Sequence, residues 1–322
     1  MRWYVVRRVL WAAVATYLIL SLTWGLLVLT PSPAAQQLQF QAAASGGDAE
    51  AAQQAFEQRR GLDRPLWVRY KEYMVNMVTL NWGWSTSRSQ PVMTAIAGAI
   101  PYTAVYSVPT TILSVLLGLA VGLYSATHQY TKTDYAATFF AFFGYAIPNF
   151  WFGIILLLVF AVHLGWFPVV FDPDVPLVGL EMARQLVLPV FVLVTGTIAG
   201  IMRYSRAEAL EYVQAEFVKT ARSKGVSEFR VLTRHILRPA AVPLMTILIG
   251  DILGIFLAAS YLVEVVFGIP GLGQLSYNAI IAQDTSLVLG TTLIFTFISV
   301  IGNLLQDLAY TVLDPRIDYG DR

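Results

Sequence analysis

Several stretches of this sequence are apolar, uncharged and long enough to cross a lipid bilayer. One of them extends from residue 89 to residue 131 without a Lys, Arg, Asp or Glu. A helix that crosses the hydrocarbon core needs about 20 such residues, because its backbone polar groups must all be paired within the segment. Only 13% of all residues are charged and 57% are apolar. We therefore expect an all-α, polytopic membrane protein and not a water-soluble domain.

Six spans are expected from these runs. They cover residues 9–29, 101–126, 135–162, 185–202, 240–262 and 285–306. The first resembles a secretory signal peptide, but the apolar region of such a peptide is usually about 7–15 residues long. Residues 9–29 form a longer run, with no clean small-residue cleavage pattern beyond it. This favours an uncleaved helix.

Positively charged residues orient the spans, because Lys and Arg in short loops stay on the cytoplasmic side. With the N-terminus inside, the short inner segments hold 14 Lys and Arg residues, whereas the short outer loops hold only Arg184. Both termini are therefore expected in the cytoplasm, in a multi-pass protein of the cell membrane.

The sequence then divides into four parts. They are a cytoplasmic tail with the first span at 1–30, an external lobe at 31–99, a five-helix transmembrane domain at 100–310 and a cytoplasmic tail at 311–322. In the lobe, the Ser-Gly-Gly-Asp run at 45–48 predicts a turn before a short polar helix that ends at Arg60. Residues 31–47 fit a loose tether equally well. Five aromatic residues suit a segment that lies along the membrane interface: Trp67, Tyr70, Tyr73, Trp82 and Trp84.

Motifs for nucleotide or ester chemistry are absent from the sequence. No Gly-Lys dipeptide occurs, so the chain lacks a G-x-x-x-x-G-K-[ST] phosphate-binding loop. There is no H-E-x-x-H or G-x-S-x-G motif and no cysteine, and His128, His163 and His235 are too scattered for a local metal motif. We expect no catalytic residue, no metal site and no cofactor in this chain. A net charge of +1 argues against nucleic-acid binding.

Four acidic residues lie within or beside the predicted spans: Asp251, Glu264, Asp284 and Asp307. A charge at membrane depth is costly and often marks a polar path. Glu264, Asp284 and Asp307 are expected near span ends, within reach of water. Asp251 lies deeper, and the sequence alone does not give its role.

The inner loop at residues 203–238 is much longer than a simple helix connection. Its first half predicts a helix with one apolar stripe, formed by Leu210, Val213, Phe217 and Ala221. Gly225 follows where a helix end favours positive φ, and Ser227 is placed to cap a second helix. This second helix has an apolar stripe and a basic row, formed by Phe229, Leu232 and Ile236 and by Arg230, Arg234 and Arg238.

Two functions fit this pair of helices. As a lipid anchor, the basic row would lie on anionic headgroups and contribute about 1 kcal/mol for each arginine. As a docking element, an apolar ridge at Phe217 and Ala221 would insert into a groove of a cytoplasmic partner. Basic side chains flank this ridge: Lys219, Arg222 and Lys224.

A family resemblance favours docking. The run EFVKTARSKG at residues 216–225, followed by RHILR at 234–238, resembles the ATPase-contacting loop of ABC importer permeases. More narrowly, it is similar to the first of the paired permeases of dipeptide, oligopeptide and nickel importers. Three further segments match the same pattern in order, at residues 61–66, 267–273 and 313–317. Two other segments differ from the family pattern. The chain has Pro-Ser-Pro at 31–33 where the family usually has Pro-Gly-Asp-Pro, and LNWGWS at 80–85 where it usually has Gly-Asp-Leu-Gly-x-Ser.

The resemblance implies a type I ABC importer permease fold and a subunit without catalytic residues. Its partners would be a homologous second permease, two ATPase subunits that bind Mg-ATP, and an external substrate-binding protein. It assigns ATPase coupling to six residues: Glu216, Phe217, Thr220, Ala221, Lys224 and Gly225. It places an external loop or gate at Glu264, Pro270 and Gly271, and the Pro-Gly pair predicts a type II turn with positive φ at Gly271.

Two other classes of protein remain as alternatives from the residues alone. An ion-gradient-coupled secondary transporter would place acids at the bundle midplane and show inverted sequence halves, which we do not find. A membrane scaffold would use the inner loop to hold partners without any substrate flux. The cargo, peptide or nickel or another small solute, is not legible from the sequence.

Overall fold

The computed structural model describes residues 2–29, 33–46, 48–59, 62–240, 244 and 260–313. Within these ranges, four segments are long and apolar enough to cross a membrane. They are Val5–Leu26 within α1 (Arg2–Leu29), α5 (Val92–Thr127), α8 (Leu180–Val213) and Thr285–Leu308 within α14 (Thr285–Leu313). Each matches a predicted span, although α5 and α8 extend well beyond the predicted bounds. Most of the predicted fifth span, with Asp251, lies outside the described residues, as do residues 314–322.

The third predicted span, residues 135–162, is not a single helix. It is divided into α6 (Lys132–Ala146) and α7 (Asn149–Leu156), which continues as the π-helix η1 (Leu157–His163), and the two parts meet at 101°. Pro148 explains the break, because proline lacks a backbone N–H and disfavours the helical region for the residue before it. Ile147 accordingly has φ −88° and ψ 128°. Counting the bent pair as one span gives up to five spans in the described ranges.

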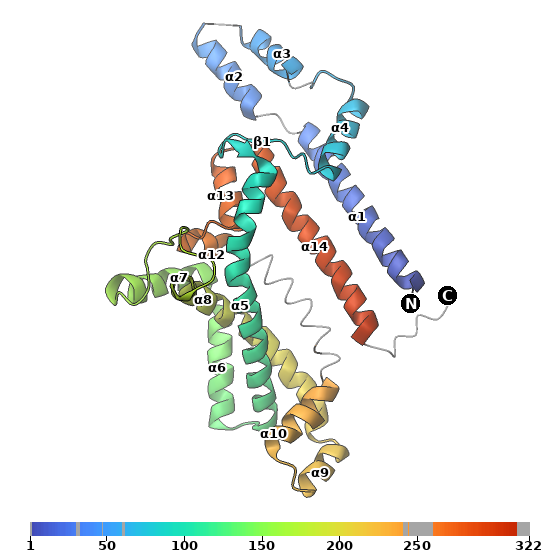
Figure 1. The fold of residues 1–322 in the computed structure, drawn as a ribbon, viewed down its shortest axis with the longest axis vertical. Helices are drawn as coiled ribbons and strands as arrows, with labels where there is room; N and C mark the ends of the chain where they lie inside the picture. The colour runs from blue at the N-terminus through green and yellow to red at the C-terminus, as the bar shows by residue number, and fades with distance from the viewer. Residues whose placement is uncertain are drawn as a thin grey trace.

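The centre of the described structure is the crossing of α5 and α8 (Figure 1). Gly118 and Gly122 lie one turn apart on α5 and allow the two helices to approach closely. A Cβ atom at Gly118 would lie 2.6 Å from Cγ2 of Ile201, and one at Gly122 would lie 2.6 Å from the carbonyl oxygen of Met202. Larger residues at either glycine would push the helices apart.

α1 lies along α14 on one side of the bundle (Figure 1). Arg8 Nη1 is 2.9 Å from Asp307 Oδ2, so an ion pair joins the two helices. α4 (Leu66–Val78) rests against the other end of α1, where the hydroxyls of Ser21 and Tyr70 are 2.7 Å apart. Asp307 keeps 23% of its side chain exposed, as expected for an acid near a span end.

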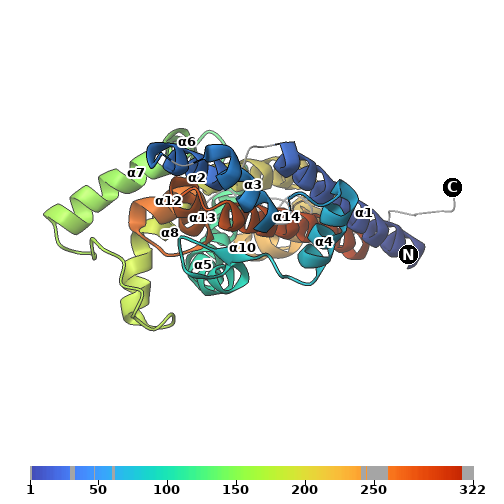
Figure 2. The same ribbon diagram turned by 90° about the horizontal axis from the view of Figure 1, so that it is seen from above.

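A helical hairpin forms the lobe beyond the end of the bundle (Figures 1 and 2). It consists of α2 (Pro33–Ala44) and α3 (Ala49–Arg59). The predicted turn between them is confirmed, since Gly46 has φ +74° and Asp48 Oδ1 accepts a hydrogen bond from the backbone N–H of Glu50 at 2.9 Å. Most of the segment that also fitted a tether is therefore helix α2. We call this end of the molecule the lobe end and the opposite end, with α9 and α10, the loop end.

A short β-hairpin, β1 (Trp84–Ser85) and β2 (Gln90–Pro91), leads from α4 into α5. Trp82, just before it, differs from the interfacial position expected for it. Its side chain is buried against Phe297 of α14, and its indole N–H donates to the carbonyl oxygen of Met77 at 3.2 Å. Trp82 therefore packs the lobe-end connection onto the bundle.

Candidate functional site

The inner loop forms two helical segments at the loop end, as its sequence predicted. They are α9 (Glu216–Ser223) and the pair α10 (Glu228–Arg230) and η2 (Val231–Leu237). Gly225 lies between them with φ +74°. Its N–H donates to the carbonyl oxygen of Arg222 at 2.9 Å, and the N–H of Val226 donates to that of Ala221 at 3.2 Å. This pair of bonds is a Schellman motif, so the prediction of positive φ at Gly225 is confirmed.

The single helix predicted over residues 210–221 is wrong. α8 ends at Val213, and Ala215 has an extended conformation with φ −64° and ψ 145°. α9 therefore starts in a new direction. Residues before and after the break do not lie on one face of a single helix. Phe217 is 48% exposed, whereas Ala221 is buried, so the two do not form a common exposed ridge.

A small apolar cluster mounts this loop on the bundle; we call it the coupling-loop core. Its buried members come from four helices: Leu123 and Ala126 of α5, Ala209 of α8, Val218 and Ala221 of α9, and Val231 and Ile236 of η2. The cluster holds α9 by one face only. The opposite face leaves Glu216, Phe217 and Thr220 exposed, and Lys224 is exposed at the end of the helix.

Charged pairs on the loop surface join residues close in sequence. Lys219 Nζ lies 2.8 Å from Glu216 Oε1 within α9, and Arg222 Nε lies 3.0 Å from Glu228 Oε1 across the glycine turn. Exposed pairs of this kind contribute little to stability, about 0–1 kcal/mol each. They leave the charged surface available to a partner.

The second helix departs from its predicted apolar stripe. Phe229 is 77% exposed, and Val231, which the prediction omitted, is buried together with Ile236. Ser227 precedes α10 but makes no side-chain capping bond. The basic row is exposed as expected, at Arg230, Arg234 and Arg238.

Glu264 lies toward the lobe end, on α12 (Ser260–Phe267), and is fully buried. The expectation that water reaches it is therefore wrong. Its Oε1 accepts hydrogen bonds from the hydroxyls of Thr103 and Tyr106 on α5, both at 2.7 Å. Its Oε2 accepts the backbone N–H of Gln274 at 2.9 Å. One carboxylate thus ties α12 to α5 and to the start of α13 (Leu272–Ile281).

The predicted type II turn at Pro270 and Gly271 is also wrong. The N–H of Gly271 donates to the carbonyl oxygen of Ile269 at 2.8 Å, an i to i+2 bond that defines a tighter γ-type turn. Gly271 has φ −89°, and positive φ occurs at Gly268 instead, at +70°. The connection after α12 is not a plain loop, because α13 follows the turn and packs against α5, α12 and α14.

Gly271 is small for a steric reason. A Cβ atom there would collide with the Glu264 carboxylate and lie 2.5 Å from Oγ1 of Thr103. The same hydroxyl accepts the backbone N–H of Leu272 at 2.8 Å. Glu264 and Gly271, two of the three residues that the family resemblance places at an external loop or gate, thus lie against each other. Thr103 and Tyr106 were missed, because hydroxyls in a long apolar run carry no sequence signal for their partners.

Asp284 precedes α14 just outside the span and is 2% exposed, so the expectation that water reaches it is wrong as well. Its Oδ2 accepts hydrogen bonds from the Ser85 hydroxyl at 2.6 Å and from the N–H and hydroxyl of Ser87 at 2.9 and 2.8 Å. Its Oδ1 accepts the N–H of Leu287 at 3.2 Å. Burial raises the pKa of Asp284, but these hydrogen bonds outweigh burial and hold the pKa below its ordinary value.

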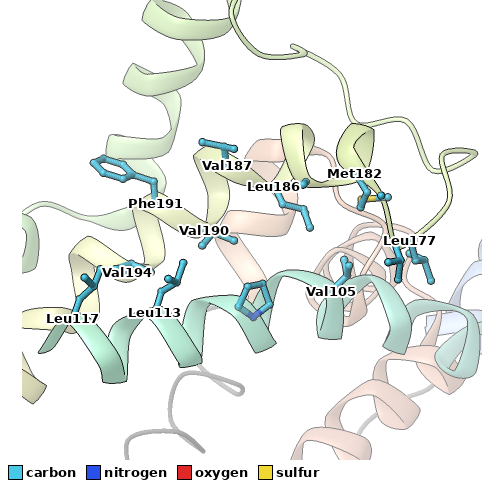
Figure 3. A pocket seen from close by; sticks show the side chains of 14 residues that line it. Val105, Leu113, Leu117, Leu177, Met182, Leu186, Val187, Val190, Phe191 and Val194 are labelled. Carbon is cyan, nitrogen blue, oxygen red and sulfur yellow. The ribbon is translucent and has the colours of Figure 1, made fainter. Parts of the chain in front are cut away.

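A lateral groove of about 540 Å³ lies between α5 and α8 (Figure 3). α5 contributes Val105, Pro109, Leu113 and Leu117, and Phe191 and Val194 of α8 lie opposite. The described residues that line it are apolar or glycine.

Comparison with known proteins gives a consistent family. Residues 118–319 match the family described as binding-protein-dependent transport system inner membrane component. The oligopeptide transport system permease protein AppB of Bacillus subtilis (strain 168) is 38% identical over 273 residues, which cover 84% of this chain and 86% of that protein. The oligopeptide transport system permease protein OppB of Haemophilus influenzae is 33% identical over 266 residues, which cover 82% of this chain and 84% of that protein.

A solved structure shares the fold. A chain of the MetNI methionine ABC transporter in an inward-facing conformation matches with a TM-score of 0.54 at 16% identity. The match covers 69% of this chain and 97% of that chain. This likeness and the sequence matches confirm the predicted helical membrane protein with a type I ABC importer permease fold. The count of six spans stays a prediction, since the described residues give up to five. The chain therefore belongs to the binding-protein-dependent transport family of inner membrane components, and it is the permease component of an ABC importer.

Proposed function

We propose that this chain is one of two homologous permease subunits that together line a pathway for peptides across the cell membrane. The sequence identity of 38% and 33% to oligopeptide permeases supports this substrate class. Two ATPase subunits would bind Mg-ATP beneath the loop end, and an external binding protein would deliver peptide at the lobe end. The distribution of Lys and Arg supports this orientation, with the loop end and both termini in the cytoplasm.

The observation that carries the proposal is the one-sided mounting of α9. Val218 and Ala221 fix one face of the helix in the coupling-loop core, and Phe217 stands exposed on the other. A short rigid helix with an exposed apolar anchor suits insertion into a groove of a partner. We assign direct ATPase contact to the exposed residues Glu216, Phe217, Thr220 and Lys224, and we assign Ala221 and Gly225 to holding the helix in position.

The coupling-loop core also explains how a movement of α9 would be transmitted to the helices that line the pathway. It joins α9 to η2, which packs on α8, and it includes residues of α5, so α9 is linked to the central pair of helices. ATP-driven closure of the ATPases would move the loop as a lever and switch the bundle between inward-facing and outward-facing states. Switching from 1:99 to 99:1 needs about 5.5 kcal/mol of differential binding, which two bound nucleotides are well able to supply.

At the lobe end, we propose that α13 is the outer gate and that Glu264, Pro270 and Gly271 hold it closed. The start of α13 is bonded to the Glu264 carboxylate and to the Thr103 hydroxyl. A movement of α5 relative to α12 would break the bonds from Thr103 and Tyr106 to Glu264 together, because both end on Oε1 of that carboxylate. The gate would therefore open in a single step.

Co-expression with the second permease and the two ATPases tests the docking assignment. Phe217→Asp places a charge where an apolar anchor is expected, so the variant should insert in the membrane but lose most of the co-purifying ATPase. Phe40→Asp is the matched control, because Phe40 is 79% exposed on α2 at the opposite end. Undiminished ATPase recovery with Phe217→Asp would refute docking and favour a lipid anchor. The purified chain alone should hydrolyse no ATP, and substantial hydrolysis would overturn the division of labour.

A further inference from the structure

An ion pair between a buried carboxylate and a half-buried arginine at the loop end has no role in the function proposed above. Arg206 of α8 places its Nη2 3.1 Å from Oδ2 of Asp134, in the first turn of α6. Asp134 is 3% exposed. Its carboxylate also accepts hydrogen bonds from the Ser125 hydroxyl of α5 and from the N–H of Tyr130 at 3.0 Å. Four segments therefore meet on one carboxylate.

The pair lies directly beside the coupling-loop core. Leu123 and Ala126 lie within two residues of Ser125 on α5, and Ala209 follows Arg206 by about one turn on α8. The three flanking residues are all buried members of that cluster. A movement of the loop relative to α5 or α8 therefore takes place next to the ion pair.

α6 also contacts α8 at its far end. A Cβ atom at Gly144 would lie 2.6 Å from the carbonyl oxygen of Thr195, so the two backbones nearly touch there. Beyond this contact the chain bends by 101° into α7, and Gly153 of α7 lies against the ring of Phe267, a Cβ there being 3.0 Å from Cε2. Phe267 belongs to α12, the helix that carries Glu264. α6 therefore lies between the loop-end ion pair and the elements at the lobe end.

An ion pair is seldom the most stabilising way to join two helices, since well-packed apolar residues often contribute as much free energy or more. The ion pair and its hydrogen bonds contribute a fixed relative orientation of the helices. A carboxylate that accepts bonds from three sides fixes the rotation and height of α6 relative to α8, whereas apolar contacts tolerate sliding.

We propose that Asp134 and Arg206 are positioning residues that make α6 move as one body with the coupling loop. The proposal rests on the proposed importer function. It predicts that loss of the pair uncouples ATP hydrolysis from peptide uptake without preventing assembly.

The first test measures distance. The chain has no native cysteine, so spin labels at Phe140→Cys on α6 and Ser223→Cys on α9, both exposed, are unique within it. In the complex with both ATPases, the label-to-label distance should stay narrow and unchanged when ATP is added. Asp134→Asn and Arg206→Gln should broaden it, and Arg206→Lys should restore it in part because it keeps the charge. Separation of the labels in the unsubstituted background on ATP addition, or a narrow distance in Arg206→Gln, would overturn the proposal.

The second test measures coupling in vesicles that contain all subunits, with labelled trialanine as the probe. ATP hydrolysed per peptide taken up should rise about tenfold in Asp134→Asn, within the usual range of coupling free energies. Glu181→Gln removes an exposed carboxylate at the other end of α8 and is the matched control, which should not change the ratio. If the ion pair had only a structural role, Asp134→Asn would lower the yield of protein and leave the ATP-to-peptide ratio unchanged. That result would contradict the proposal.

These outcomes separate the two proposals. If the unsubstituted chain fails to bind ATPases or to support uptake, the importer function fails. The width of the distance distribution is also read on the purified chain alone, so the positioning role of the ion pair is still decided in that case.

Discussion

The two candidate functional helices, α13 at the lobe end and α9 at the loop end, are attached to the bundle by different kinds of interaction. At the lobe end, buried carboxylates collect directional hydrogen bonds: Glu264 joins α5, α12 and α13, and Asp284 joins the β-hairpin to α14. At the loop end, an apolar cluster carries α9, and most charges on the loop face outward. A directional network has one geometry and breaks as a unit, whereas an apolar mount leaves a polar surface free for a partner. The difference suits a gate at one end and a docking element at the other.

The largest loss of stability is expected from Glu264→Leu. It leaves the Thr103 and Tyr106 hydroxyls and the N–H of Gln274 buried without their acceptor, at about 1–3 kcal/mol for each unsatisfied donor. Thermal unfolding in detergent measures the loss. Tyr106→Phe removes one donor only and should cost far less. Equal losses from the two variants would contradict the idea that bonds converge on Glu264.

Gly271→Ala comes next. The added Cβ collides with Glu264 and with Oγ1 of Thr103, and overpacking of this kind costs about 1–3 kcal/mol. Uptake should fall with stability, because the start of α13 is displaced. Gly98→Ala is the control, since a Cβ at Gly98 has no atom within 4 Å. Unchanged unfolding and uptake in Gly271→Ala would show that α13 adjusts freely.

Asp284→Asn should cost about 1.5–3 kcal/mol at neutral pH, the usual value of hydrogen bonds to a charged group. The pKa of Asp284 is lowered in the folded protein, so its contribution is present above the ordinary aspartate pKa and is lost as pH falls through the folded value. The difference in stability between the native chain and Asp284→Asn should therefore shrink on acidification below about pH 4. A difference that grows in acid would contradict the sign of this pKa shift.

Gly225→Val tests the loop end. A β-branched residue at φ +74° costs about 1–2 kcal/mol in backbone strain, and no atom lies within 4 Å of its Cβ. We expect a small loss of stability and a large loss of peptide-stimulated ATP hydrolysis. Gly46→Val is a closely matched control, because Gly46 also has φ +74° and open space around it. If both variants keep native coupling, the turn at Gly225 does not position α9.

The smallest effect is expected from Glu228→Gln. It removes the exposed ion pair with Arg222, which contributes about 0–1 kcal/mol and weakens in salt. Unfolding of this variant at low and high salt should differ little from that of the native chain. A loss comparable to that of Gly271→Ala would show that the attachment of α9 also depends on directional polar bonds.

The sequence by itself determined the features that depend on neighbouring residues. Apolar run length predicted four segments that are long and apolar enough to cross the membrane, because a backbone in lipid has to pair its own polar groups. Glycine at a helix end predicted positive φ at Gly225, and the Gly-Gly-Asp turn predicted the start of α3. The run at residues 216–225 also predicted the family by resemblance, and the sequence matches then confirmed it.

Only the tertiary structure decided which faces meet. Asp284 bonds Ser85, 199 residues earlier, and Glu264 bonds Thr103, 161 residues earlier. No local period relates such positions, so both acids were expected near water. The break at Ala215 likewise redirected an apolar stripe and buried Ala221 while it exposed Phe217. The physical reason is that helix formation uses bonds between residues four apart, whereas the burial of a side chain depends on how distant helices cross.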